Sequence, residues 1–279
     1  MRDKILELAE EQKISAVGIC RTSDYIKRTE GLLTKASFCA EDTGVLEDSK
    51  SIIVCAFSYY NGGRKGNISR YAQGADYHLV VRKKMEPICE YLKKNGFSAE
   101  SFADTGTLNE RILANLSGIA FFGKNQMAIN DELGSYFFIG YIITDCEIPA
   151  DIPNTQKCND CGRCIKACPL GALLDNDFCQ EKCLSYITQK KGELSFEEKE
   201  AIKKTKTVWG CDICQEVCPH NQEIKKTSIP EFRENLIIDL EIDETLSNKE
   251  FKKLYGNRAF SWRGKQVLLR NLKIMKGDI

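Results

Sequence analysis

Two cysteine runs in the second half of the chain restrict its fold and chemistry more than any other feature. Nine of its 14 cysteines lie between residues 158 and 218. The first run reads Cys158-x2-Cys161-x2-Cys164-x3-Cys168-Pro169, and the second reads Cys211-x2-Cys214-x3-Cys218-Pro219. The first spacing is that of bacterial ferredoxins, in which three cysteines bind one [4Fe–4S] cluster and the fourth binds another. The segment therefore predicts two iron–sulfur clusters.

The ligands of the two clusters can be assigned except for one. Eight thiolates are needed, the runs supply seven, and Val208 stands where the second run would begin with a cysteine. Cys179 and Cys183 lie between the runs, and either could be the eighth ligand. We expect crossed ligand sets: Cys158, Cys161 and Cys164 with Cys218, and Cys211 and Cys214 with Cys168 and one of the intervening cysteines. A zinc ribbon is the alternative, but it uses only four ligands in two CxxC pairs.

Composition excludes several classes of protein. Of the 279 residues, 42% are hydrophobic and 29% charged, as in a packed globular protein. Lys plus Arg and Asp plus Glu both total 40, which excludes a globally basic nucleic-acid binder. No apolar run reaches the ~18 residues of a membrane span, and the N-terminus does not read as a signal peptide. We therefore expect a cytoplasmic protein with reduced thiols and no membrane partner. Packing should bury its other cysteines: Cys20, Cys39, Cys55, Cys89 and Cys146.

The chain divides into three predicted segments. In residues 1–150, strand-like apolar runs alternate with helical patterns, which predicts an α/β or α+β domain around a sheet. Strands are expected at 14–20, 51–59, 97–103 and 134–144, and helices at 3–12, 76–94 and 108–116. Residues 151–222 form a predicted ferredoxin-like domain with a helix near 195–206, and residues 223–279 a helical tail. A front segment this long favours a redox enzyme over a simple electron carrier.

Several motifs resemble those of the epoxyqueuosine reductases. The segment from Arg70 to His78, RYAQGADYH, resembles their RYAxGxDYH signature. Asp104-Thr105-Gly106, followed by Glu110 and Gly123-Lys124-Asn125, resembles their D-[ST]-[AG]-P…E…GKN block. CLSYIT at 183–188 resembles C-[IL]-S-Y-[LI]-T, and residues 210–221 resemble GCDxCQxxCPxN. Arg270-Asn271 matches an RN pair. The motifs follow the family's order over most of the chain.

The resemblance implies a cobalamin-dependent reductase that converts epoxyqueuosine to queuosine at the wobble position of tRNA. It implies an N-terminal α/β cobalamin-binding domain, a double [4Fe–4S] ferredoxin-like domain and a short helical tail. It selects Cys183 as the eighth ligand and Asp104 as the catalytic proton donor. Base-off cobalamin is expected, because Val81 stands where the D-x-H-x-x-G ligand motif has glycine. The expected cofactor contacts are Arg70, Tyr71, His78, Asp104, Lys124, Asn125, Asn130 and Ser135.

Proton donation by Asp104 near neutral pH requires a raised pKa. An apolar pocket would raise it, and Phe102, Phe121 and Phe122 are candidates for lining that pocket. Departures from the family pattern include Thr107 in place of proline and His220 in place of tryptophan.

Partners are also implied by the resemblance. They are the anticodon stem-loop of tRNA and an external low-potential donor such as ferredoxin or flavodoxin, with a monomer favoured. The chain resembles a short form without the helical repeats that hold tRNA in longer members. Residues 249–276 carry nine Lys or Arg and one Glu, so they could contact phosphates or form a solvated helical face. Tyr255, Phe260 and Trp262 could stack on bases or pack in a helical core. A related reductase of a small molecule or corrinoid protein, and an electron carrier, are the alternatives.

Overall fold

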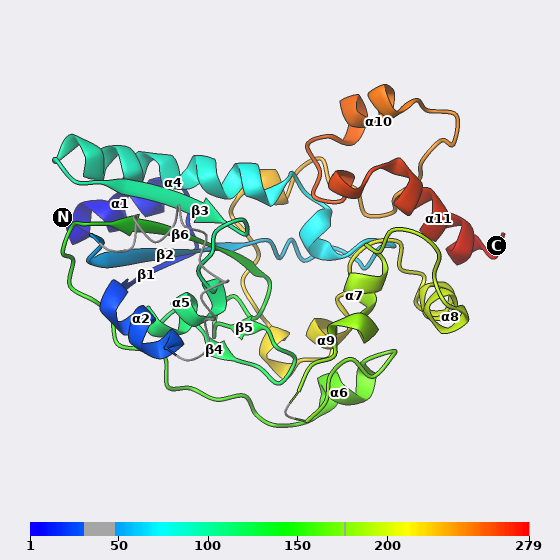
Figure 1. The fold of residues 1–279 in the computed structure, drawn as a ribbon, viewed down its shortest axis with the longest axis horizontal. Helices are drawn as coiled ribbons and strands as arrows, with labels where there is room; N and C mark the ends of the chain where they lie inside the picture. Colours follow the sequence, from blue (N-terminus) through cyan, green and yellow to red (C-terminus); the bar gives the residue numbers. More distant parts are fainter. Residues whose placement is uncertain (31–47, 176, 279) are drawn as a thin grey trace.

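The structure is a computed structural model that describes residues 1–30, 48–175 and 177–278. Its N-terminal part is built on a four-stranded sheet with strand order β1-β2-β6-β3 (Figure 1). Every pairing in this sheet is antiparallel, and the strands are β1 (Ala16–Arg21), β2 (Ser51–Ser58), β3 (Ala99–Ala103) and β6 (Phe137–Thr144). The predicted α+β class and the four predicted strands are confirmed, with ends that shift by up to three residues.

Helices cover both faces of this sheet because its central strand β2 carries buried side chains on both sides. Alternate residues of a strand point to opposite faces. Ile53, Cys55 and Phe57 pack with helices α1 (Arg2–Glu11) and α4 (Tyr77–Lys94). Their neighbours in β2 pack with α2 (Thr22–Thr29) and α5 (Glu110–Leu116) on the other face. Helix α2 was not among the predicted helices, and β4 (Phe121–Phe122) and β5 (Ala128–Ile129) form a separate small hairpin.

The cysteine-rich segment consists of short helices joined by turns, and the tail lies beside it (Figure 1). The cysteine-rich segment contains α6 (Arg163–Ala167), η3 (Gln180–Lys182), α7 (Leu184–Ile187), α8 (Phe196–Thr205), α9 (Ile213–Glu216) and η4 (Pro219–Asn221). The tail contains η5 (Pro230–Phe232), α10 (Asn248–Tyr255), η6 (Ser261–Arg263) and α11 (Lys265–Lys276). A further short turn, η2 (Arg70–Ala72), precedes α4 in the N-terminal part. The tail shares a core with Ile68 and Trp209, so it packs against both preceding segments.

A network of buried hydrogen bonds, called the buried joint below, holds the cysteine segment against the sheet domain. The carboxylate of Asp212 accepts hydrogen bonds from the Ser69 hydroxyl and, at 2.8 Å, from the Arg70 backbone N–H. Gln215 Nε2 donates to the carbonyl and the hydroxyl of Ser135 at 2.9 and 3.0 Å. Asn221 accepts from the Ser135 N–H at 2.7 Å. Because buried polar groups are costly to leave unpaired, these bonds hold one relative position of the two segments.

The cysteines outside the runs lie in the core, as expected. Cys20, Cys55, Cys89 and Cys146 are buried, whereas Cys39 lies outside the described residues. In the tail, Phe260 is fully buried and Tyr255 packs against it, while Trp262 is 61% exposed. Within the described parts of the chain, every helix is too short or too polar to cross a lipid bilayer.

Candidate active site

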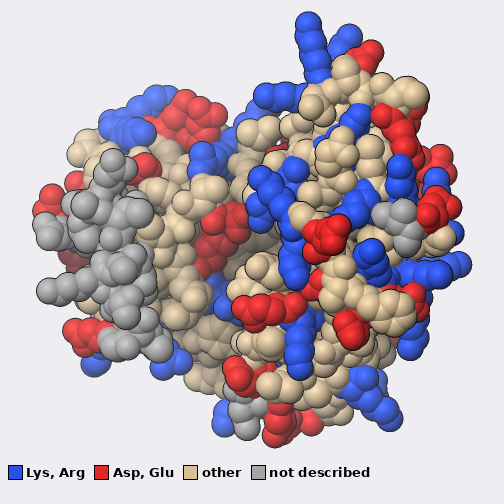
Figure 2. Space-filling model, turned by 45° about the vertical axis from the view of Figure 1, so that its right-hand side comes forward, with Lys and Arg blue, Asp and Glu red and all other residues tan. Residues whose placement is uncertain are grey.

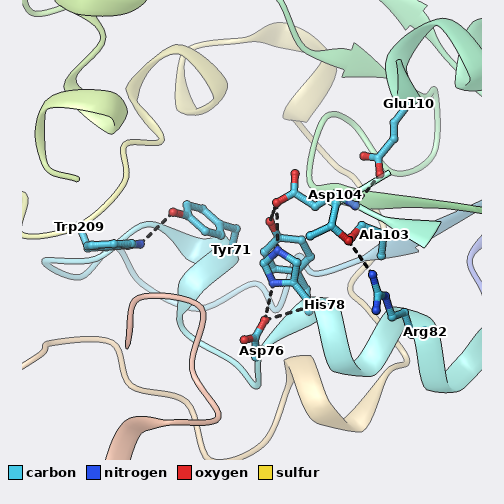
Figure 3. A network of polar contacts seen from close by, with 10 residues as sticks. Tyr71, Asp76, His78, Arg82, Ala103, Asp104, Glu110 and Trp209 are labelled. Carbon is cyan, nitrogen blue, oxygen red and sulfur yellow. Dashed lines mark hydrogen bonds and ion pairs between the residues drawn. The ribbon is translucent and has the colours of Figure 1, made fainter. Parts of the chain in front are cut away.

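A group of polar side chains surrounds Asp104, which directly follows β3 (Figure 3). His78 Nε2 lies 2.9 Å from Asp104 Oδ2, and the Tyr77 hydroxyl donates to the same oxygen at 2.8 Å. On the other side of the imidazole, Nδ1 lies 2.7 Å from Asp76 Oδ1. Asp76 is also the N-cap of α4, where its side chain accepts the His78 backbone N–H. The start of α4 therefore holds the histidine between two carboxylates.

This arrangement bears on the expectation that no histidine binds cobalt. Both ring nitrogens of His78 lie within hydrogen-bonding distance of carboxylates. A ring nitrogen needs a free lone pair to bind a metal. His78 is therefore engaged as a polar residue of the site, and base-off binding of cobalamin stays a prediction.

The charges in this group determine where its proton resides. Hydrogen bonds from the imidazolium to the carboxylates of Asp104 and Asp76 raise the pKa of His78 to about 9, against the effect of burial. The same hydrogen bond from His78, helped by Tyr77, holds the pKa of Asp104 below its usual value. At neutral pH the pair is therefore an imidazolium and a carboxylate that share a proton through the Nε2–Oδ2 contact.

The expectation that an apolar pocket raises the pKa of Asp104 is wrong. Phe102 stacks on Tyr141 with ring centroids 5.1 Å apart, Phe121 packs in a small core with Ile129, and Phe122 is exposed. Alternation along β3 places Phe102 on the opposite face of the sheet from Ala103. The Asp104 side chain is 56% exposed, and its closest neighbours are proton donors rather than phenyl rings.

The loop that carries Asp104 has an unusual backbone conformation. Asp104 has a φ of 60°, in the left-handed region that non-glycine residues seldom adopt. Its backbone N–H donates to Glu110 Oε1 at 2.6 Å, and Arg82 donates to the Thr105 hydroxyl at 2.5 Å. Glu110 and Arg82 come from α5 and α4, so two helices hold the loop (Figure 3). Burial raises the pKa of Glu110 to about 7.

Asp104 lines a cavity of about 460 Å³ whose lining also includes four of the predicted cluster ligands. Tyr77, Phe138, Met127, Leu173 and Ile213 give the cavity a mainly apolar lining, and Tyr71 and Glu110 add polar groups. The four cysteines in the lining are Cys168, Cys183, Cys211 and Cys214. The cavity therefore brings Asp104, the partner of His78, and one complete predicted ligand set to the same space.

The other predicted ligand set lines a smaller, neighbouring pocket. Its lining includes Cys158, Cys161, Cys164 and Cys218. Cys179 lines neither space, and its thiol lies 3.6 Å from Glu181 Oε2. No three His, Cys, Asp or Glu side chains among the described residues are grouped as ligands of a single metal ion.

Two buried nitrogen atoms without hydrogen-bond partners lie at these spaces. His220 Nε2, a donor or an acceptor according to the tautomer, is buried and makes no hydrogen bond to any described residue, and His220 lines the smaller pocket. Asn125 Nδ2 is likewise buried and unpaired, and Asn125 lines both spaces. Buried donors that lack a partner indicate an acceptor that belongs there. The sulfur atoms of a cluster and the polar edge of a corrinoid fit this requirement.

Four of the eight expected cofactor contacts lie in other surroundings. Arg70 lies over the rings of Tyr60 and Tyr136 and donates to the Gly63 carbonyl, and Ser135 belongs to the buried joint. Lys124 forms ion pairs with Asp160 and Asp175 and lines the smaller pocket rather than the Asp104 cavity. Asn130 donates to the Ile119 carbonyl at 2.7 Å. Tyr71, Asp104 and Asn125 line the cavity, and His78 joins it through Asp104.

Glu110 belongs to the motif that begins at Asp104, but it is not among the predicted site residues. Its position six residues after Asp104 places it in the first turn of α5, from which its carboxylate reaches back to the loop. The spacing of the acid and the glutamate was the available signal. What the pattern alone could not indicate is that the contact is made to the backbone of Asp104.

Comparisons with known proteins agree with this geometry. Residues 41–105 match the family described as epoxyqueuosine reductase QueG, DUF1730, and residues 157–221 match the 4Fe-4S double cluster binding domain. The epoxyqueuosine reductase of Lactococcus garvieae is 33% identical over 100% of this chain and 87% of its own length. The chain belongs to the epoxyqueuosine reductase family. The Bacillus subtilis epoxyqueuosine reductase is 34% identical, and the alignment spans 62% of its length.

Solved epoxyqueuosine reductases share this fold. The Streptococcus thermophilus structure has a TM-score of 0.81 at 32% identity and covers 99% of this chain and 80% of its own. An epoxyqueuosine reductase with an epoxyqueuosine-modified tRNA-Tyr stem-loop has a TM-score of 0.82 at 29% identity, and covers 98% and 80%. A Bacillus subtilis structure, with a TM-score of 0.79 at 29% identity and covering 98% and 80%, has its aspartate catalytic loop swung out of the active site. A reductive dehalogenase at 15% identity, with a TM-score of 0.52, shares the fold alone.

Proposed function

We propose that this epoxyqueuosine reductase family member reduces the epoxide of epoxyqueuosine in tRNA, with Asp104 and His78 supplying the proton. The observation that carries the proposal is the shared cavity. Asp104, Cys168, Cys183, Cys211 and Cys214 all line it. A reductive step needs an electron source and a proton source at the same substrate atom, and a candidate for each lines this cavity.

The residues around the cavity fit a corrinoid as the resident cofactor. The lining is mainly apolar, as the faces of a macrocycle require, and the unpaired Asn125 amide supplies a donor for its polar edge. Tyr71, Tyr77 and Asn125 would hold it. When bound, it would supply the strong reductant that epoxide opening needs, with single electrons from the clusters.

The two cysteine groups suggest a direction for electron entry. Cys161, in the group at the smaller pocket, is exposed, whereas the other group lines the Asp104 cavity. An external low-potential donor such as ferredoxin or flavodoxin would therefore dock on the Cys161 side. Electrons would pass from the cluster held there to the one at the cavity. In this proposal Cys183, which lines the cavity, is the eighth ligand and Cys179 is not.

Residues of this chain can supply the protons that removal of the epoxide oxygen requires. Removing an epoxide oxygen as water breaks two C–O bonds and consumes two electrons and two protons. The pair holds one transferable proton at neutral pH, because the pKa of His78 is raised to about 9 while that of Asp104 is lowered. Asp104 Oδ2 would pass this proton to the departing oxygen as His78 Nε2 supplies it. The second proton would come from solvent through the same pair.

A tRNA substrate also fits the setting of the cavity. A relative has been solved with an epoxyqueuosine-modified tRNA stem-loop, and the present fold covers 80% of that chain. We infer that this protein likewise binds the anticodon stem-loop, acts as a monomer and works in the cytoplasm, where its substrate tRNA resides.

The test compares Asp104→Asn with the wild type in anaerobic turnover of an epoxyqueuosine-containing stem-loop, with cobalamin and a chemical reductant added. Asparagine keeps the size and polarity of the side chain but cannot act as an acid. We expect turnover to fall by about 10²- to 10⁴-fold, with unchanged iron and corrinoid content. Asp24→Asn, at an exposed aspartate of α2, is the matched control. Full turnover by Asp104→Asn would remove Asp104 from the mechanism, and an inactive wild type would refute the proposed reaction.

A further inference from the structure

A second surface cleft, of about 630 Å³, adjoins the Asp104 cavity. The two spaces share Phe178, Cys183 and Ser185 in their linings, so one continues into the other. The remaining lining of the cleft comes from residues 180–191, around α7, and from η6 in the tail. In Figure 2, Lys and Arg side chains lie beside the hollow on this face of the molecule, and Asp and Glu side chains border the hollow as well. A ligand that enters the cavity from this side would extend into the cleft.

The charge of the cleft has one sign. Lys190, Lys191 and Arg263 line it, and no Asp or Glu belongs to its lining. Lys190 pairs with Glu198, but Lys191 and Arg263 form no ion pair with any residue that the structure describes. Arg263 also has a buried Nε atom that lacks a hydrogen-bond partner. Uncompensated cations and an unpaired guanidinium N–H indicate a ligand with anionic acceptors.

Aromatic side chains that are partly exposed to solvent lie beside these cations. Trp262 is 61% exposed, although the neighbouring Phe260 is fully buried. The Arg263 guanidinium lies 3.8 Å from the centroid of the Trp262 ring, and most of the Trp262 side chain is nevertheless accessible to solvent. Phe178 and Tyr186 are 38% and 39% exposed in the same cleft. Exposed planar rings beside cations are the elements with which proteins bind unpaired nucleotides.

We propose that this cleft binds the nucleotides that flank the modified base in the anticodon loop. One base would stack on Trp262, and the adjoining phosphates would lie against Arg263 and Lys191. The proposal rests on the proposed function, because the modified base must enter the Asp104 cavity for its neighbours to reach the cleft. Residues of the tail and of the cysteine segment would then recognise the loop directly.

Two observations favour single-stranded RNA over an acidic electron-donor protein as the occupant. The cleft continues into the substrate cavity through three shared residues, which suits a polymer with one unit bound in each space. The cysteine group that includes the exposed Cys161 lies at a different pocket, so a donor protein has a separate surface to approach. The exposed ring of Trp262 suits a base, whereas a donor protein would require only the charges.

The experiment measures binding of an unmodified anticodon stem-loop to the anaerobically prepared holoprotein by fluorescence anisotropy. Trp262→Ala should weaken binding by about 5- to 150-fold, the loss of one stacked base, whereas Trp262→Phe should retain most of the affinity. Lys191→Ala should lower the slope of log Kd against log salt by about 1, the loss of one phosphate contact. Phe196→Ala is the matched control, because Phe196 is 75% exposed but outside the cleft.

The outcomes separate this proposal from the proposed function. Binding defects in both cleft variants, with normal binding by Phe196→Ala, support the cleft even if the wild type proves inactive on epoxyqueuosine. Unchanged affinity in Trp262→Ala together with an unchanged salt slope in Lys191→Ala refutes it. If the two variants bind RNA normally but accept electrons poorly from reduced flavodoxin, the cleft is a donor site and the RNA proposal is wrong.

Discussion

The hydrogen bond between Glu110 and the backbone of Asp104 offers the sharpest test of how this site is organised. Glu110 Oε1 accepts the Asp104 N–H at 2.6 Å, and Asp104 has a φ of 60°. A left-handed conformation costs a non-glycine residue roughly 1–2 kcal/mol. A hydrogen bond to a charged group contributes about 1.5–3 kcal/mol. The two terms are similar, so the loop conformation depends on this bond. We therefore regard Glu110 as a positioning residue for Asp104.

Glu110→Ala leaves the cost of the left-handed conformation uncompensated, so the fraction of molecules with Asp104 in place should fall by about 6- to 30-fold. Glu110→Gln keeps an oxygen at the same position, so its loss should stay within about tenfold, the value of a neutral hydrogen bond. The assay is single-turnover reduction of an epoxyqueuosine stem-loop by pre-reduced holoprotein, at matched iron and corrinoid content. If Glu110→Ala reacts within twofold of the wild type, the loop does not depend on Glu110 and this reasoning fails.

The pH dependence of stability provides a second measurement on the same variant. Burial raises the pKa of Glu110 from 4.5 to about 7, so the folded state holds this proton more tightly than the unfolded state. The associated stability is present below about pH 4.5 and is lost as pH rises through about 7. Its upper limit is about 3 kcal/mol, reduced by solvent screening. Glu110→Gln cannot ionise, so anaerobic denaturation should show it gaining stability relative to the wild type between pH 5 and pH 8.

Two further predictions concern the cysteines and His78. Cys183→Ser should lower the iron content from about eight to about four per chain, or leave a damaged cluster at the cavity, whereas Cys179→Ser should keep all eight; equal iron in both variants would contradict the assignment of Cys183. His78→Gln removes the imidazolium that lowers the pKa of Asp104 and holds the shared proton. Turnover at pH 7.5 should fall by about 10²-fold or more, and the decline of wild-type activity near pH 9 should disappear; an unchanged pH profile would exclude His78 as the proton reservoir.

The parts of the site that could be predicted from sequence are those determined by short spacings. The short spacings within each cysteine run predict which thiols of that run lie close together, and the structure distributes the thiols of both runs over the linings of two neighbouring spaces. Their assignment as cluster ligands stays a prediction. The strands were predicted because β2 and β6 are long, apolar and rich in β-branched or aromatic residues. Helix α2 was missed because its sequence, TSDYIKRT, has few apolar residues to define a period.

The proton chemistry of Asp104 could not be predicted, because its partners come from distant parts of the chain. His78 and Tyr77 begin α4, and Asp104 follows β3, which pairs with β6. Only the packing of α4 on the sheet brings the histidine to the acid. Nearby phenylalanines in the sequence suggested an apolar environment, but strand alternation and the β4–β5 hairpin direct them elsewhere. The sign of the pKa shift therefore depended on tertiary contacts alone.

Polar residues within the second cysteine run hold the cysteine segment in a fixed position relative to the sheet domain that carries Asp104. Asp212 lies between the ligands Cys211 and Cys214, and Gln215 follows directly. Both are buried and bond to the sheet domain at Ser69, Arg70 and Ser135. A shift of the cysteine segment relative to the sheet would leave a buried carboxylate unpaired, which costs several kcal/mol. If Cys211 and Cys214 bind the cluster at the Asp104 cavity, as proposed, the same short segment also sets the distance of that cluster from Asp104.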